Sequence, residues 1–187
     1  MTFAARALAF LFPFLLAACG SPELVSVSAP EITKKSSIAF ASVEVRNVSL
    51  PSYAATDEIH IRAEDGTLSS PSSVLWSDAP ERSIALELSQ NLARLTGRRV
   101  ASEPWPFEEF AAARLEIRFA DLVANTTGEF RTSGQYFVSV RDGGRERSGL
   151  FDLSVSFDPK GGPNALAAAR GQLILDLAAF VAKNGLR

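Results

Sequence analysis

Only one cysteine, Cys19, and one histidine, His60, occur in the 187 residues, so the side chains most used in catalysis and metal binding are scarce. A zinc or copper site normally takes three or four ligands from His, Cys, Asp and Glu. A Ser-His-Asp arrangement needs a positioned serine, and the sequence has no Gly-x-Ser-x-Gly turn. The neighbours of His60 favour a solvent-facing or edge position in a strand. We therefore expect no catalytic residue, no metal site and no cofactor.

Other residues that invite a functional interpretation are acidic or aromatic. Glu108 and Glu109 are adjacent, but adjacent side chains tend to point apart and make poor partners across a glycosidic bond, so a solvated loop is expected. Trp76 and Trp105 are candidate partner contacts because tryptophan is enriched at the energetic centres of interfaces. Packing in or over the core is the alternative for each. Tyr53 is a third candidate contact.

The sequence around Cys19 predicts a lipid anchor. The apolar run from Ala7 to Leu16 follows Arg6, is too short to span a bilayer and ends in small residues, which predicts a cleaved signal peptide over residues 1–18. The order Leu16-Ala17-Ala18-Cys19 resembles the bacterial lipoprotein box. This resemblance implies a diacylglyceryl group on the thiol and a further acyl chain, such as palmitate, on the amine. Two or more chains hold a protein on a membrane. A secreted protein with a free thiol is the alternative.

The composition is that of a folded protein without a nucleic-acid partner. Hydrophobic residues make up 47% of the chain and charged residues 21%, close to globular averages. The formal net charge of −2 leaves no basic footprint for DNA or RNA. Without a second cysteine no intramolecular disulfide can form. We expect no later stretch apolar enough to span a membrane, so the acyl chains are the only expected contact with lipid.

The first part of the mature chain mixes loop and strand signals. Residues 19–37 are expected to form the lipidated N-terminus and a tether rich in Ser and Pro. Within them, Leu24 to Ser28 alternates as a short edge strand would. With that strand the free tether is about four residues, and without it about 18 residues at ~3.3 Å each. We favour the strand. A further strand is expected over residues 38–48 and another over 58–63.

Two amphipathic helices and a hairpin follow. The first helix is expected to begin near Ser77, with Asp78 as its cap, and to end at Gly97. After a Pro-rich loop, strict alternation predicts a strand over residues 114–119. A hairpin of residues 130–140 and 151–157 then has one apolar and one wet face. The last helix is expected to begin near Asn164 and to close at Asn184-Gly185. The two apolar stripes are Ile84, Leu88, Leu92 and Leu95 in the first helix, and Leu166, Leu173, Leu177, Phe180 and Val181 in the second.

These elements predict an α+β fold. Three antiparallel strands around two amphipathic helices favour a two-layer sandwich with a mostly antiparallel sheet and both helices on one face. The length allows one domain of ordinary size, which we place at residues 38–187.

The order of several segments resembles a known family. They are Leu24–Ser28, Ile38–Val45, Leu50-Pro51-Ser52-Tyr53, Glu58–Arg62, Leu75–Asp78, Asn91-Leu92-Ala93, Arg114–Phe119 and the hairpin to Phe157. Together they resemble the ABC-type transport auxiliary lipoproteins, the PqiC-like lipoproteins associated with MCE proteins. One departure is that Ala54–Glu58 replaces a basic residue usual between the tyrosine and the next strand.

The resemblance implies a periplasm-facing, non-catalytic lipoprotein that works with an MCE-family protein, a permease and an ATPase to move lipid between two membranes. Gly20 and Ser21 lack the aspartate that resembles an inner-membrane retention signal, which favours an outer-membrane anchor. Docking of the transport assembly there is the implied role, and a homo-oligomer is possible. The alternative is a structural lipoprotein of outer-membrane assembly, for lipopolysaccharide or for a barrel.

Overall fold

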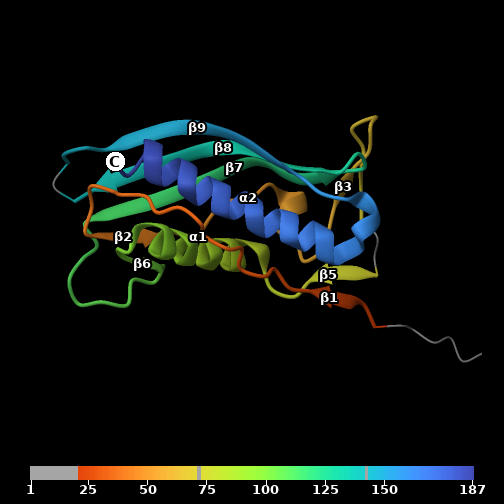
Figure 1. Ribbon diagram of the computed structural model, residues 1–187, viewed down its shortest axis with the longest axis horizontal. Helices are drawn as coiled ribbons and strands as arrows, with labels where there is room; N and C mark the ends of the chain where they lie inside the picture. Colours follow the sequence, from red (N-terminus) through yellow and green to blue (C-terminus); the bar gives the residue numbers. More distant parts are fainter. Residues whose placement is uncertain (1–20, 71–72, 142) are drawn as a thin grey trace, which may run out of the picture.

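Figure 1 shows the computed structural model, which describes residues 21–70, 73–141 and 143–187. Cys19 and the expected signal peptide lie outside the described residues. The elements in chain order are β1 (Glu23–Val25), β2 (Ser42–Val45), η1 (Ser52–Ala54), β3 (Ile61–Arg62), β4 (Leu68–Ser69), β5 (Val74–Trp76), α1 (Pro80–Thr96), β6 (Arg99–Ser102), β7 (Ala113–Asn125), β8 (Glu129–Val140), β9 (Arg147–Ser156), η2 (Pro159–Gly161) and α2 (Gly162–Asn184).

The α+β class is confirmed, and the main sheet is mixed. β7, β8 and β9 form the expected antiparallel meander, in which Phe130 is opposite Val155. On the other edge of β7, β2 and β3 both pair in parallel, at opposite ends of the strand. β6 follows α1 directly and pairs in parallel with β2. A strand that returns beside an earlier one after a crossover helix runs parallel to it. β6, which we expected to be loop, is therefore a strand.

A second, two-stranded sheet holds the N-terminal segment. β1 pairs in parallel with β5, so the strand expected at Leu24–Ser28 begins one residue earlier and ends at Val25. Val25 is buried, and the chain beyond it crosses the helices, where Ser36 donates its N–H to the carbonyl of Leu95. A Cβ on Gly171 of α2 would lie 2.9 Å from the carbonyl oxygen of Ser28. The segment before residue 38 thus packs on the fold through β1 and the chain that follows it.

Both helices lie on one face of the main sheet (Figure 1). The α1 stripe is buried as expected, and Gly97 ends the helix with a φ of 67°. Asp78 is not the cap. Ala79 occupies that position, and the Asp78 carboxylate instead pairs with Arg82, with Oδ2 2.5 Å from Nη2. Pro80 in the first turn supplies a fixed φ, which starts the helix without a side-chain cap.

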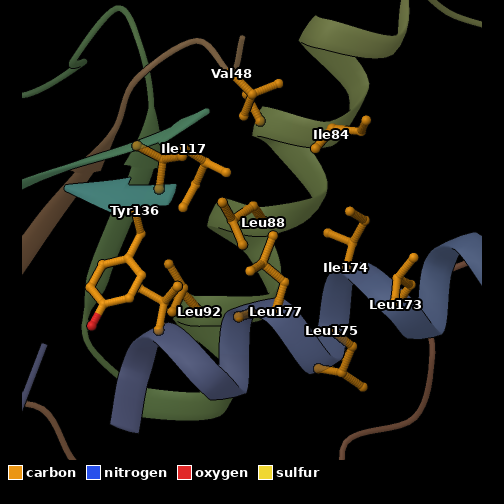
Figure 2. Packing of buried hydrophobic residues seen from close by; sticks show 14 of the residues in the cluster. Val48, Ile84, Leu88, Leu92, Ile117, Tyr136, Leu173, Ile174, Leu175 and Leu177 are labelled. Atoms are coloured by element: carbon orange, nitrogen blue, oxygen red, sulfur yellow. The ribbon is translucent and has the colours of Figure 1, made fainter. Parts of the chain in front are cut away.

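The core lies between the helices and the inner face of the meander. Figure 2 shows Leu88 and Leu92 of α1 beside Leu177 of α2, with Ile117 of β7 and Tyr136 of β8 facing them.

The segment Pro159–Asn184 is long and apolar enough to cross a membrane, which corrects our expectation that no later stretch would be. In the fold, however, 67% of its most apolar window is buried. Its apolar residues extend around most of the helix, as expected for a core helix.

Candidate functional site

A polar cluster joins the turn after β2 to the far end of β7. Pro51 begins the 3₁₀ turn η1, which turns Tyr53 towards β7. Asp121 directly follows a β-bulge in β7, and its carboxylate lies within hydrogen-bond distance of the Tyr53 hydroxyl. Arg62 of β3 donates two hydrogen bonds to this carboxylate, Nη1 to Oδ2 at 2.8 Å and Nη2 to Oδ1 at 2.7 Å. The Tyr53 hydroxyl donates to Oδ1 and accepts the N–H of Leu122 at 3.2 Å.

The charges in this cluster stabilise one another. Burial alone would raise the pKa of Asp121, but the hydrogen bonds from Arg62 and Tyr53 outweigh it and hold that pKa below its ordinary value. Burial and the bond to Asp121 raise the pKa of Tyr53, which stays a neutral donor. Both carboxylate oxygens of Asp121 accept hydrogen bonds. The cluster therefore links three segments of the fold, and Asp121 is not available as a catalytic acid or base.

A second cluster places a buried cation between the helices. Arg170 of α2 has 3% of its surface exposed, and its Nη2 donates to Ser83 Oγ at 2.7 Å and to Glu87 Oε1 at 2.9 Å on α1. Its guanidinium carbon lies 4.6 Å from the ring centre of Trp76. Burial raises the pKa of Glu87 despite the nearby Arg170 charge. Among the described residues, Arg170 Nε and Glu87 Oε2 have no hydrogen-bond partner.

A small cavity separates the two clusters. Tyr53, His60, Trp76 and Arg170 are among its lining residues, and its volume of about 20 Å³ has room for one water molecule. His60 is half-buried, where we expected a solvent-facing or edge position, because its ring packs edge-on against Tyr53. The described residues contain no group of three or more His, Cys, Asp or Glu that could hold a metal ion. The arrangement suits bracing of the fold, since the cavity is too small for an organic substrate.

The three candidate contact residues therefore lie in different places. Tyr53 is half-buried in the first cluster, and Trp76 is buried under Arg170, where it packs and offers little surface to a partner. Trp105 remains near the surface, with Nε1 donating to the carbonyl of Glu109 at 2.7 Å. Glu108 and Glu109 lie in the exposed loop that we expected.

The loop that carries Trp105 forms an aromatic and arginine-rich surface that we had not singled out. Phe107 and Phe110 are 43% and 63% exposed. Arg99 lies over the ring of Phe107, with 4.9 Å from its guanidinium carbon to the ring centre, and Arg141 lies over Phe110 at 3.7 Å. The Pro-rich sequence indicates a loop, but nothing in its pattern shows that an arginine of β6 and the arginine directly after β8 meet it.

Comparison with known proteins adds the family. A model of the ABC-type transport auxiliary lipoprotein component matches residues 24–182. The chain belongs to this family. Its members are auxiliary lipoproteins of ABC-type transport, so the expected resemblance is confirmed. A comparison with curated protein sequences gave no significant match.

Solved structures share the fold. The crystal structure of an uncharacterised protein superposes with a TM-score of 0.71 at 16% identity, covering 88% of this chain and 98% of that one. A protein from Xanthomonas campestris superposes with a TM-score of 0.65 at 12% identity, covering 86% of this chain and 95% of that one. PelC from Paraburkholderia phytofirmans, described as a dodecamer, superposes less well, with a TM-score of 0.44 at 13% identity and coverage of 83% and 96%.

Proposed function

We propose that this chain is a lipid-anchored, non-catalytic docking component of an ABC-type lipid transport system, held by Cys19 on the periplasmic side of the outer membrane. The partners in this proposal are an MCE-family protein, a permease and an ATPase. The observation that carries it is the family match, which begins at residue 24, only five residues after the lipoprotein-box cysteine.

The packing of the N-terminal segment supports a role close to the membrane. Glu23 is already hydrogen-bonded to the carbonyl of Ser73 at 2.8 Å. The chain between Cys19 and Glu23 spans at most about 14 Å at ~3.5 Å per residue. An acylated Cys19 therefore holds β1 and β5 near the bilayer. In Figure 1 the loop between β6 and β7 and the turn between β8 and β9 lie at the other end of the long axis.

The exposed features that a partner could use are at strand edges and at this far end. β9 pairs only with β8 among the described strands, so its outer edge is open along ten residues. Leu150 in β9 is 71% exposed. An open edge allows strand addition by another chain, and an exposed leucine adds apolar contact. The same edge offers a surface for a homo-oligomer.

Co-purification from membranes tests the partner. The tagged full chain, extracted in mild detergent, is expected to recover an MCE-family protein. A Leu150→Asp variant is expected to recover less, and Leu86→Asp, at a leucine of α1 that is 37% exposed, serves as the control. Recovery of an outer-membrane barrel or lipopolysaccharide-assembly protein without any MCE protein would instead support the structural lipoprotein.

Fatty-acid labelling tests the anchor. Wild-type chain in cells fed labelled palmitate is expected to carry label and to fractionate with the outer membrane. Cys19→Ser should lose both label and membrane association, because no other thiol can accept the lipid. Unchanged labelling in Cys19→Ser would contradict the proposed anchor, and fractionation of the wild type with the inner membrane would contradict the proposed location.

A further inference from the structure

We infer that an open groove between the start of β7 and the end of β8 binds the phosphodiester headgroup of a phospholipid. The groove has a volume of about 370 Å³, within the range of small-ligand sites. Phe110, Ala111, Arg114, Ser139, Val140 and Arg141 line it. The groove lies at the end of the sheet away from β1 (Figure 1). Arg114 is opposite Ser139 at the start of β7, whereas β3, which is near β1, pairs with the last residues of β7. This inference goes beyond the proposed function, since docking requires no ligand.

Two arginines at the groove are held in position before any ligand arrives. Glu44, whose side chain is 9% exposed, accepts a hydrogen bond from Arg114 Nε at 2.6 Å, and this leaves the two terminal nitrogens of Arg114 as donors. The guanidinium of Arg141 stacks over the ring of Phe110, which fixes its plane, and no described residue accepts a hydrogen bond from its edge. Planar guanidinium groups donate paired hydrogen bonds to phosphate oxygens.

The charge of the groove fits a singly charged anion. Glu44 neutralises Arg114, and Arg141 forms no ion pair with any described residue, so one positive charge remains among the groups described at this site. A phosphodiester carries one negative charge, which matches it. The hydroxyl of Ser139 adds a donor that is also an acceptor.

The apolar side of the groove favours a lipid over a free phosphate. Phe110 is 63% exposed and lines the groove together with Val140 and Ala111. Inorganic phosphate would leave these apolar side chains exposed to water. The glycerol and the first methylene groups of a phospholipid would bury them. A nucleic-acid phosphate is disfavoured by the formal net charge of −2.

Native mass spectrometry of the full chain in a phosphate-free detergent measures the binding of added phosphatidylglycerol, and calorimetry measures the binding of inorganic phosphate. We expect one bound lipid and much weaker binding of phosphate. Arg141→Gln should weaken lipid binding about tenfold or more, since a charge-assisted hydrogen bond is worth about 1.5–3 kcal/mol. Phe110→Ala should weaken it less.

Arg131→Gln is the matched control, because Arg131 is an exposed arginine of β8, the strand that Arg141 follows, and pairs with Asp152 outside the groove. It should bind lipid as the wild type does, and circular dichroism should show all three variants folded. Lipid binding that Arg141→Gln leaves unchanged would overturn the inference. So would binding of inorganic phosphate alone, or of an acidic peptide in place of the lipid.

Discussion

Asp121 and Arg170 show how differently two charged side chains contribute within one fold. The Asp121 carboxylate is 22% exposed and has all its hydrogen-bond partners in place. Arg170 is buried with a single acidic partner, Glu87, and each of the two keeps one atom without a partner among the described residues. A hydrogen-bonded charge pair near the surface stabilises a protein only modestly. Removing one partner of a buried pair destabilises it strongly, because the other charge stays buried without a partner.

Asp121→Asn should destabilise the protein by about 1–3 kcal/mol at neutral pH, because charge-assisted hydrogen bonds from Arg62 and Tyr53 are weakened. The folded-state pKa of Asp121 lies below 3.8, its ordinary value. Its stabilising effect is therefore fully present above that ordinary value and is lost as pH falls through the folded one. Urea unfolding should show the difference from wild type shrinking below about pH 4. Asp152→Asn, in an exposed pair with Arg131, should destabilise the protein much less, because solvent screens that pair.

Arg170→Met should destabilise the fold by about 3–5 kcal/mol, since it leaves the Glu87 carboxylate buried without a cation. Adding Glu87→Gln should recover part of this loss because the remaining group is neutral. A double-mutant cycle in urea unfolding measures the coupling between the two residues. If the double variant were no more stable than Arg170→Met, the burial of Glu87 would not be the cause.

At the scale of the elements, two strands each depend on a single residue. β8 depends on a glycine that lies close to the backbone of β7, and β1 depends on one buried side chain. Gly134 of β8 lies beside the bulge of β7, where a Cβ would stand 2.2 Å from the carbonyl oxygen of Arg118. β1 has only three residues and is attached by Val25, which is 3% exposed, while its neighbour Leu24 is 62% exposed.

Gly134→Ala should lower the melting temperature markedly, because the added methyl group meets backbone that cannot move without breaking the β7–β8 pairing. Gly144→Ala is the control, since a Cβ there meets nothing within 4 Å. Thermal unfolding of both variants checks this. Equal melting temperatures would show that the bulge relaxes to accept the methyl group.

Val25→Asp should release β1 and the segment behind it, because an unpaired carboxylate would be buried against the core. Hydrogen exchange at the amides of Glu23 and Ser77, both bonded across the β1–β5 pair, should speed up strongly. Leu24→Asp, on the exposed face of the same strand, should leave both amides protected. Fast exchange in both variants would mean that the pairing of β1 with β5 also requires the exposed side chain of Leu24.

The sequence predicted both helices, the meander and the short strands β1 and β2, but it missed β5 and β6. Alternating apolar residues identified β8, β9 and the first half of β7, and the stripe from Ile84 to Leu95 identified α1. β5 and β6 have three and four residues, too few to show a period, and their pairing depends on the rest of the fold. Tyr53 and Trp76 were singled out as aromatic residues. Their contacts with Asp121 and Arg170 join segments far apart in the chain, which local patterns cannot reveal.

On the scale of the whole molecule, charge is unevenly distributed along the sheet. At the end formed by β6, the start of β7 and the β8–β9 turn, arginines outnumber acidic residues among those described. At the β1 end the acidic residues predominate. The two sets are Arg46, Arg98, Arg99, Arg114, Arg141, Arg145 and Arg147 against Glu44, Glu103, Glu108, Glu109 and Glu146 at the first end, and Glu23, Asp57, Glu58, Glu64, Asp65 and Asp158 against Arg62 and Lys160 at the second.

If the transport partner docks at the arginine-rich end, its recovery should fall as ionic strength rises, since exposed charges are screened over about 8–10 Å at physiological salt. The double variant Arg145→Ser, Arg147→Ser should recover less partner at low salt and show a weaker salt dependence. Glu64→Gln at the opposite end should behave as wild type. Co-purification at several salt concentrations measures this, and recovery independent of salt would place the contact elsewhere.

The parallel pairing of β1 with β5 also has a mechanical consequence. Any load between a membrane anchor at Cys19 and a partner at the far end must pass through β1, the first element of the described chain. β1 is bonded to β5 at both of its ends, from Glu23 to Ser73 and from Ser77 to Val25. A pull along the strand loads these hydrogen bonds in shear, all together, and the segment over Gly171 resists next. An anchor at Cys19, as proposed above, would therefore act on the domain through a strand pair that resists tension along its axis.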